Sequence, residues 1–163
     1  GPRLRGFSCA RAPRIHQSAR NESVTHRAKS PPFMSDLPFF VAVQTAVAKD
    51  PRYDPHAYEF VREALHLAAK HFREGQEDQH VTGGEVLEGV RMHALAEYGP
   101  LALHLLHSWG LRRGEDVGNI VYNLIETGYF GKNDGDSIED FAGGYDFETA
   151  FTQPFMPSST TPA

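Results

Sequence analysis

Cysteine is almost absent from this chain of 163 residues, in which Cys9 is the only one. A single cysteine cannot form an intrachain disulfide, so a disulfide-stabilised fold is excluded and a reducing environment is expected. Long apolar runs are absent too, since no segment approaches the roughly 18 apolar residues of a membrane-spanning helix. The two absences together predict a cytoplasmic protein.

Basic side chains are scarce after the first 33 residues. Residues 1–33 contain seven of the sixteen Lys and Arg and a single acid, Glu22, so residues 34–163 contain nine basic and twenty acidic side chains. This acidic part repels the phosphate backbone of nucleic acids, which proteins bind through Lys and Arg. The charge distribution therefore favours a protein partner, of basic character, over nucleic acid or a membrane.

The first 33 residues show no apolar periodicity and are rich in Arg and Ser. Such a composition is typical of a transit peptide, but it also fits translated upstream sequence ahead of a start at Met34. We favour the second interpretation because the stretch has no amphipathic face. Either way, we expect a disordered basic leader at 1–33, a single domain at 34–152 and a disordered tail at 153–163.

Apolar residues in the domain recur at spacings of three and four, which predicts an all-α bundle of about five helices. Phe40, Val43 and Val47 form the expected inward stripe of the first helix, and Arg73 is expected to face outward on the second. Capping residues and glycine or proline breaks set the ends. The predicted helices are residues 37–49, 55–74, 83–98, 101–109 and 115–127, with short C-terminal helices at 138–142 and 147–151.

The stretch from Gly99 to Gly110 is the most apolar of these segments. Its pattern predicts a buried central helix with Leu101, Leu105 and Trp109 in the core. Two further glycines, Gly89 and Gly118, lie inside predicted helices, where glycine costs about 1 kcal/mol relative to alanine. We expect a close approach between helices at both positions to offset that cost.

Five sets of segments of the chain form a distinctive pattern. They are Tyr53-Asp-Pro-His-Ala-Tyr-Glu-Phe-Val61, His80-Val-Thr-Gly-Gly-Glu-Val-Leu-Glu-Gly89, Tyr98-Gly-Pro-Leu-Ala102 with Trp109-Gly110, Glu115-Asp-Val-Gly-Asn-Ile-Val-Tyr-Asn-Leu-Ile125, and Asp140-Phe141 with Tyr145-Asp-Phe-Glu-Thr-Ala-Phe151. In these segments the chain resembles a small family of uncharacterised bacterial proteins known mainly from planctomycetes and verrucomicrobia. The resemblance covers most of residues 53–151, implies a start at Met34 and supplies no activity.

Two patterns suggest metal binding. His104 and His107 are three residues apart, so they lie on one helical face, but zinc needs further ligands, for which His93 and Glu97 are candidates. The alternative is that the pair is the polar strip of a buried helix, and we favour it. The acidic loop 133–140 lacks the ligand spacing of an EF-hand, so we interpret it as a solvated turn.

Catalytic signatures are missing from the sequence. It contains no G-x-S-x-G or H-E-x-x-H motif and no cysteine after Cys9, so the expected protein is not an enzyme and needs no cofactor. Residues 109–130 are somewhat similar to a helix-turn-helix followed by a wing, which makes a nucleic-acid-associated protein the second hypothesis. The would-be recognition helix carries no Lys or Arg, which disfavours it.

The first hypothesis is a non-enzymatic module that binds another protein. Its expected surface consists of an outward helical face with one exposed aromatic residue and of an acidic, aromatic segment at 136–151. Phe141, Phe147 and Phe151 of that segment are expected to close the core instead. The candidate contact residues are Asn119, Tyr122, Glu126, Asp140, Tyr145 and Asp146.

Overall fold

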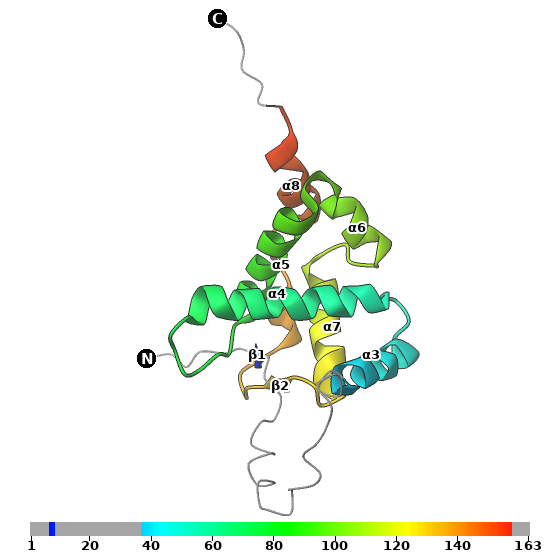
Figure 1. Ribbon diagram of the computed structural model, residues 1–163, viewed down its shortest axis with the longest axis vertical. Helices are drawn as coiled ribbons and strands as arrows, with labels where there is room; N and C mark the ends of the chain where they lie inside the picture. Colours follow the sequence, from blue (N-terminus) through cyan, green and yellow to red (C-terminus); the bar gives the residue numbers. More distant parts are fainter. Residues whose placement is uncertain (1–6, 9–36, 158–163) are drawn as a thin grey trace, which may run out of the picture.

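The structure is a computed structural model that describes residues 7–8 and 37–157 (Figure 1). The described residues confirm the predicted all-α fold: they form α-helices and 3-10 helices (η), with two strands of two residues each. In chain order the elements are β1 (Phe7–Ser8), α3 (Leu37–Lys49), α4 (Pro55–Arg73), α5 (Gly83–Tyr98), η2 (Gly99–Leu101), α6 (Ala102–Ser108), α7 (Gly114–Glu126), β2 (Gly131–Lys132), η3 (Ile138–Phe141), α8 (Phe147–Thr152) and η4 (Gln153–Phe155).

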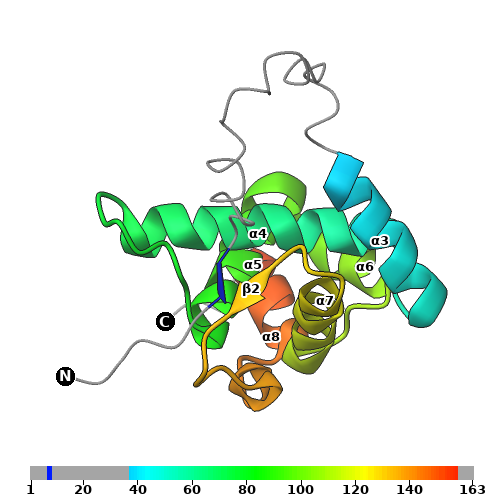
Figure 2. The same ribbon diagram turned by 90° about the horizontal axis from the view of Figure 1, so that it is seen from below.

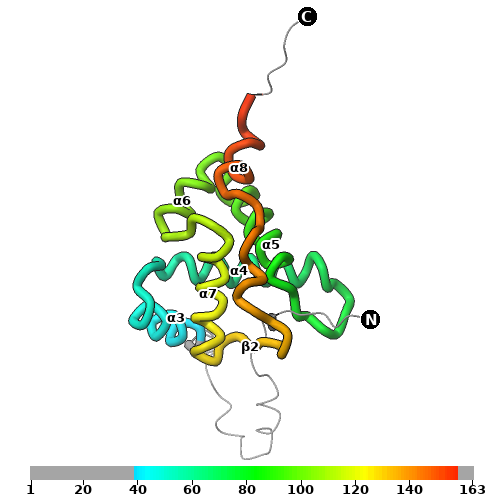
Figure 3. Tube along the Cα trace, turned by 180° about the vertical axis from the view of Figure 1, so that it is seen from behind, coloured from blue at the N-terminus to red at the C-terminus, as the bar shows by residue number. Residues whose placement is uncertain are grey.

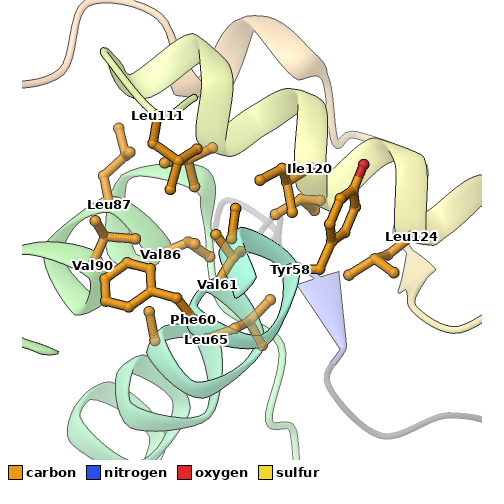
Figure 4. Packing of buried hydrophobic residues seen from close by; sticks show 14 of the residues in the cluster. Tyr58, Phe60, Val61, Leu65, Val86, Leu87, Val90, Leu111, Ile120 and Leu124 are labelled. Carbon is orange, nitrogen blue, oxygen red and sulfur yellow. The ribbon is translucent and has the colours of Figure 1, made fainter. Parts of the chain in front are cut away.

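Helix α4 lies at the centre of the bundle. The Asp54 carboxylate accepts a hydrogen bond from the His56 backbone N–H, and Pro55 occupies the first turn, where its missing N–H costs nothing. The apolar face of α4 packs against α5 and α7. Figure 4 shows buried side chains of these three helices converging, among them Tyr58, Val86 and Ile120. Burial of this face is the main source of stability in such a bundle.

The stretch from Gly99 to Gly110 is peripheral, so its predicted central position is wrong. Helix α6 has seven residues and buries only Ala102 and Leu106, whereas Leu101 is 63% exposed. The bounding glycines do break the chain as predicted, with φ of 52° at Gly99 and 94° at Gly110. These turns set a short helix at one end of the molecule, beside α8 (Figure 3).

The two interior glycines lie at close approaches, as predicted. A Cβ atom at Gly89 of α5 would be 2.4 Å from the Ala64 carbonyl oxygen of α4. At Gly118 of α7 a Cβ would be 2.9 Å from the Phe141 side chain of η3. Both distances are shorter than any carbon contact a folded protein tolerates, so the helices require glycine here.

Two side chains face the opposite way from their predicted orientation. Phe40 is 57% exposed, because α3 turns Phe39, Ala42, Val43 and Ala46 inward instead. Arg73 is only 6% exposed, since its guanidinium donates to the His80 carbonyl oxygen and to Glu85. The orientation of Phe40 could not be predicted because apolar residues occur on more than one side of α3. Arg73 is buried at the end of α4 because the loop that follows supplies a carbonyl acceptor for its guanidinium.

The C-terminal part follows the prediction closely. The hydroxyl of Ser137 and the carboxylate of Asp146 cap η3 and α8. All three phenylalanines expected in the core are buried: Phe141, Phe147 and Phe151. Residues 153–155 form the 3-10 helix η4, so the predicted disorder of the tail is wrong there; residues 158–163 lie outside the described residues.

The strands β1 and β2 form a short antiparallel pair, with Phe7 opposite Lys132 (Figure 2). The prediction of a wholly disordered leader is therefore wrong at residues 7–8, and it lies outside the described residues elsewhere in 1–33. Within the described part of the chain, every helix is too short or too polar to cross a membrane.

Candidate interaction surfaces

Asn119 belongs to a hydrogen-bond network between the α3–α4 loop, α4 and α7, rather than to an outward face. Its side-chain amide donates to the Tyr53 hydroxyl at 2.9 Å, and this hydroxyl donates to the Asp116 carboxylate at 2.7 Å. Burial raises the pKa of Tyr53 to about 12. Asn119 is half-buried and serves as a partner of the buried Tyr53 hydroxyl. Its contact with another protein stays a prediction.

One helical turn later, Asn123 of α7 forms a second cluster of side-chain hydrogen bonds. Its amide nitrogen lies 2.9 Å from the hydroxyl of the buried Tyr58 and 2.9 Å from the Asp50 carboxylate. The Arg52 guanidinium also donates to Asp50, at 2.7 and 2.8 Å, and holds the pKa of this carboxyl well below its usual range. The two clusters, Tyr53 with Asp116 and Asn119 and Tyr58 with Asp50 and Asn123, lie one turn apart along α7, and we call them together the α4–α7 network.

The other two predicted residues of α7 do not form an exposed aromatic face. Tyr122 is half-buried and its hydroxyl oxygen is buried, so burial, with the nearby Asp136 carboxylate, raises its pKa to about 12. Glu126 is exposed, but its carboxylate pairs with the Lys49 ammonium at 2.5 Å. The expected full exposure of Tyr122 is wrong, because α7 packs against η3. Contact of Tyr122 or Glu126 with another protein stays a prediction.

In the acidic segment the predicted residues mainly support local structure. The Asp140 carboxylate accepts a hydrogen bond from the Ser137 backbone N–H. The half-buried Tyr145 hydroxyl donates to the Leu87 carbonyl oxygen at 2.7 Å, and burial raises its pKa. Asp146 caps α8 and is the exposed member of the three.

The acidic loop is a turn, as interpreted, but Asp136 in it is not solvated. Asp136 is 6% exposed, and its Oδ2 accepts a hydrogen bond from the Asn133 backbone N–H at 2.6 Å. Burial, with the charge of Asp140, raises the pKa of this carboxyl. Only a tertiary contact could reveal this burial, since the local sequence is that of an exposed turn.

His104 and His107 line an open groove between α6 and α8. His104 is exposed and His107 is half-buried. His93, suggested as a third ligand, instead stacks on Phe60 and lies 3.1 Å from Glu63. The described residues hold no group of three His, Cys, Asp or Glu side chains that could bind a metal.

The α6–α8 groove has a volume of about 510 Å³ and is lined by both apolar and polar side chains. Two neighbouring apolar side chains protrude there, Phe155 at 44% and Met156 at 57% exposure. Glu148 is the one acidic side chain among the residues that line this groove. The groove is lined by Pro100, Leu103, His104, His107, Glu148, Phe151, Thr152, Phe155, Met156 and Pro157.

A second groove, of about 670 Å³, lies between α3 and α4. Its floor is apolar, and its edge carries Glu59 and Arg62 of α4. Figures 1 and 3 place α3 and α8 at different ends of the molecule, so the two grooves are well separated. The α3–α4 groove is lined by Phe39, Phe40, Val43, Gln44, Val47, Ala48, Pro55, His56, Glu59 and Arg62.

Helix α7 is badly placed to read DNA. It packs against α3, α4 and η3, and its fully exposed residues are Glu115 and Glu126. The Asp116 carboxylate accepts hydrogen bonds from the backbone N–H groups of Arg112 and Arg113. A recognition helix needs a free face with donors or basic residues, and α7 offers neither.

Comparisons with protein-family models, with curated proteins and with solved structures found no match for this chain. The resemblance to the planctomycete and verrucomicrobial family therefore stays a prediction.

Proposed function

We propose that this protein is a cytoplasmic, non-enzymatic interaction module, and that its α6–α8 groove binds a basic, partly apolar segment of a partner protein. The observation that carries the proposal is the exposed pair Phe155 and Met156 beside a groove that is lined by one acid, Glu148. Exposed apolar clusters rimmed by polar groups are typical of protein-binding surfaces. We also propose that the chain belongs to the family its segments resemble.

The apolar part of the groove provides the anchors. Met156 is unbranched and flexible, so it adapts to different partner side chains. Phe155 and Leu103 supply flatter apolar contacts on either side. A partner segment with apolar residues at spacings of three and four would place two or three of them against this apolar part, the usual way a helix occupies a groove.

The charge around the groove selects the partner. Residues 133–157 contain six Asp and Glu and no Lys or Arg, and Glu148 and Asp146 of this stretch are exposed at α8. This one-sided charge attracts a basic segment and repels an acidic one. It also repels nucleic acid phosphates, so the second hypothesis would have to rely on Arg112 and Arg113 at the start of α7.

The groove is held in place by the core. Phe147 and Phe151 of α8 are buried and stack on each other edge to face at 5.3 Å. Such a preformed site loses little conformational entropy when it binds. We therefore expect micromolar affinity for a suitable peptide even though the groove is small.

A peptide titration tests the proposal. The probe is a fluorescein-labelled 18-residue helix with Leu at i, i+3, i+4 and i+7 and Lys elsewhere; its counterpart has Glu in place of Lys. We expect saturable anisotropy with the full chain for the Lys peptide only. The double variant Phe155→Ser/Met156→Ser should weaken binding at least tenfold, and Glu148→Gln should weaken it about threefold, an effect that salt removes.

The control variant is Glu77→Gln, which removes an exposed acid from the loop between α4 and α5 and should leave the affinity unchanged. Equal binding by the wild type and the double variant would show attraction to net charge alone and contradict the proposal. A labelled DNA duplex belongs in the same titration. Saturable duplex binding that Arg112→Ala abolishes would favour the nucleic-acid hypothesis instead.

A further inference from the structure

The outer surface of α3 is unusual for an exposed helix. No Asp, Glu, Lys or Arg occurs between Leu37 and Lys49. Phe40 and Val41 on this surface are 57% and 51% exposed, although the opposite side of the helix is packed in the core. The exposed side of α3 also carries Gln44 and Thr45, so its apolar part is the patch formed by Phe40 and Val41. Two large apolar side chains exposed side by side are typical of a contact surface.

We propose that this patch contacts a second copy of this chain, packed across a two-fold axis with Phe40 of each copy in the α3–α4 groove of the other. The surface offers both parts of such a contact next to each other. Phe40 protrudes, and the apolar hollow formed by Val43, Val47 and Pro55 lies beside it. A two-fold axis brings each protrusion to the other copy's hollow, as an isologous interface requires.

The charged edge of the groove is self-complementary as well. Glu59 and Arg62 lie three residues apart on α4, so they share one side of that helix. The Arg62 guanidinium sits 4.1 Å from the centre of the Phe39 ring, which holds it at the groove edge. In a two-fold pair, Glu59 of one copy can meet Arg62 of the other.

Net charge favours this face over others for self-association. The full chain carries a net charge of −5, and residues 34–163 carry nine basic and twenty acidic side chains, so the acidic surfaces of two copies repel each other. The outer surface of α3 is uncharged between Leu37 and Lys49 and its edge carries one acid and one base, whereas the exposed acids Asp146 and Glu148 at α8 would repel the same acids of a second copy. The α6–α8 groove fits a basic partner, and the α3–α4 groove fits an identical one.

The size of the contact sets its strength. A helix of 13 residues is about 20 Å long, so a pair of α3 helices with the α4 edges makes a small interface. Interfaces at the small end of the range are usually weak and reversible. We expect a dimer with a dissociation constant of about 1–100 μM, and this inference is independent of peptide binding in the α6–α8 groove.

Sedimentation velocity of the full chain from about 1 to 300 μM tests the inference. We expect the weight-average mass to rise from the 18.1 kDa of one chain towards twice that value. Phe40→Glu should keep the protein monomeric at every concentration, with an unchanged circular dichroism spectrum. Phe155→Glu, which places the same charge in the other groove, should dimerise like the wild type.

A charge swap identifies the interface. Glu59→Lys should weaken the dimer at least fivefold, and adding Arg62→Glu in the same chain should restore it, because the pair then meets with reversed signs. A wild-type protein that stays monomeric to 300 μM would overturn the inference. So would a dimer that Phe40→Glu leaves intact, since another surface would then hold the copies together.

Discussion

Helix α4 takes part in two regions that differ in how completely they are filled. On its inner side, Gly89 of α5 approaches so closely that a methyl group would overlap the α4 backbone, and Asn123 of α7 satisfies the buried Tyr58 hydroxyl. At its outer edge, near Pro55, the α3–α4 groove leaves Phe40 exposed. Stability is therefore concentrated in the first region, and the second is free to serve binding.

The largest effect is expected where α4 and α5 touch. Gly89→Ala places a Cβ 2.4 Å from the Ala64 carbonyl oxygen and 2.9 Å from the Ala68 Cβ, so the helices must separate. We expect about 3 kcal/mol of destabilisation, or a fall of about 10 °C in Tm, despite the better helix propensity of alanine. Gly89→Leu should lower Tm further than Gly89→Ala does, because its side chain is larger.

The matched control for this change lies on the same helix. Gly84 is exposed in the first turn of α5, and a Cβ there would meet only the Thr82 hydroxyl oxygen at 4.0 Å. Gly84→Ala should leave the protein as stable or raise its stability by up to about 1 kcal/mol. If both variants melted at the wild-type temperature, the close approach would have no energetic importance.

These contrasts show which features could be predicted from the sequence. Local signals sufficed for most helix ends, which capping residues, glycines and prolines set, and for the close approach at Gly89, because each depends on neighbouring residues or on one geometric cost. They failed for the Gly99–Gly110 stretch, because apolar side chains that line a groove have the same pattern as those that fill a core.

The candidate site was harder to predict for a related reason. The helical pattern placed Asn119 and Tyr122 on one side of α7, but it could not show that this side meets the α3–α4 loop and η3. Asn119 there satisfies a tyrosine 66 positions away in sequence. Two features of the α6–α8 groove could be predicted, the pair His104 and His107 and the acidic composition after residue 133. Its exposed apolar side chains, Phe155 and Met156, were assigned to a disordered tail.

The second-largest loss of folding stability is expected in the α4–α7 network. Asn123→Ala removes the donor to the buried Tyr58 hydroxyl and to Asp50. We expect destabilisation of about 1–3 kcal/mol, because a buried polar group then loses its partner. Denaturant unfolding measures it. The double variant Asn123→Ala/Tyr58→Phe should recover part of the loss, and if it were less stable than either single change, the hydrogen bond would not explain the effect.

A smaller effect on the stability of the fold is expected when the pH is lowered. The Arg52 guanidinium depresses the pKa of Asp50, so this carboxylate stabilises the fold fully above its unfolded pKa of about 4, and the contribution is lost as the pH falls towards the folded value. Asp50→Asn should therefore lower Tm at pH 7 and reduce the fall in Tm between pH 6 and pH 3. Asp134→Asn, at an exposed loop position, is the control; an equal change there would contradict the assignment to Asp50.

The smallest effect on stability is expected in the grooves, and it separates binding from folding. Phe40→Ser and Met156→Ser each remove a side chain that is 57% exposed, so little apolar area returns to water on unfolding. At 1 μM, the lower limit of the expected dissociation constant, at least half of the chains are monomeric, and both variants should melt within about 2 °C of the wild type. At 300 μM the wild type and Met156→Ser should melt at a higher temperature than at 1 μM, because a dimer stabilises the folded state by mass action. Phe40→Ser should lose that concentration dependence, and thermal unfolding at the two concentrations shows whether it does.

A large loss of Tm at 1 μM in either variant would mean that these side chains belong to the core, and the division between a filled centre and open grooves would be wrong.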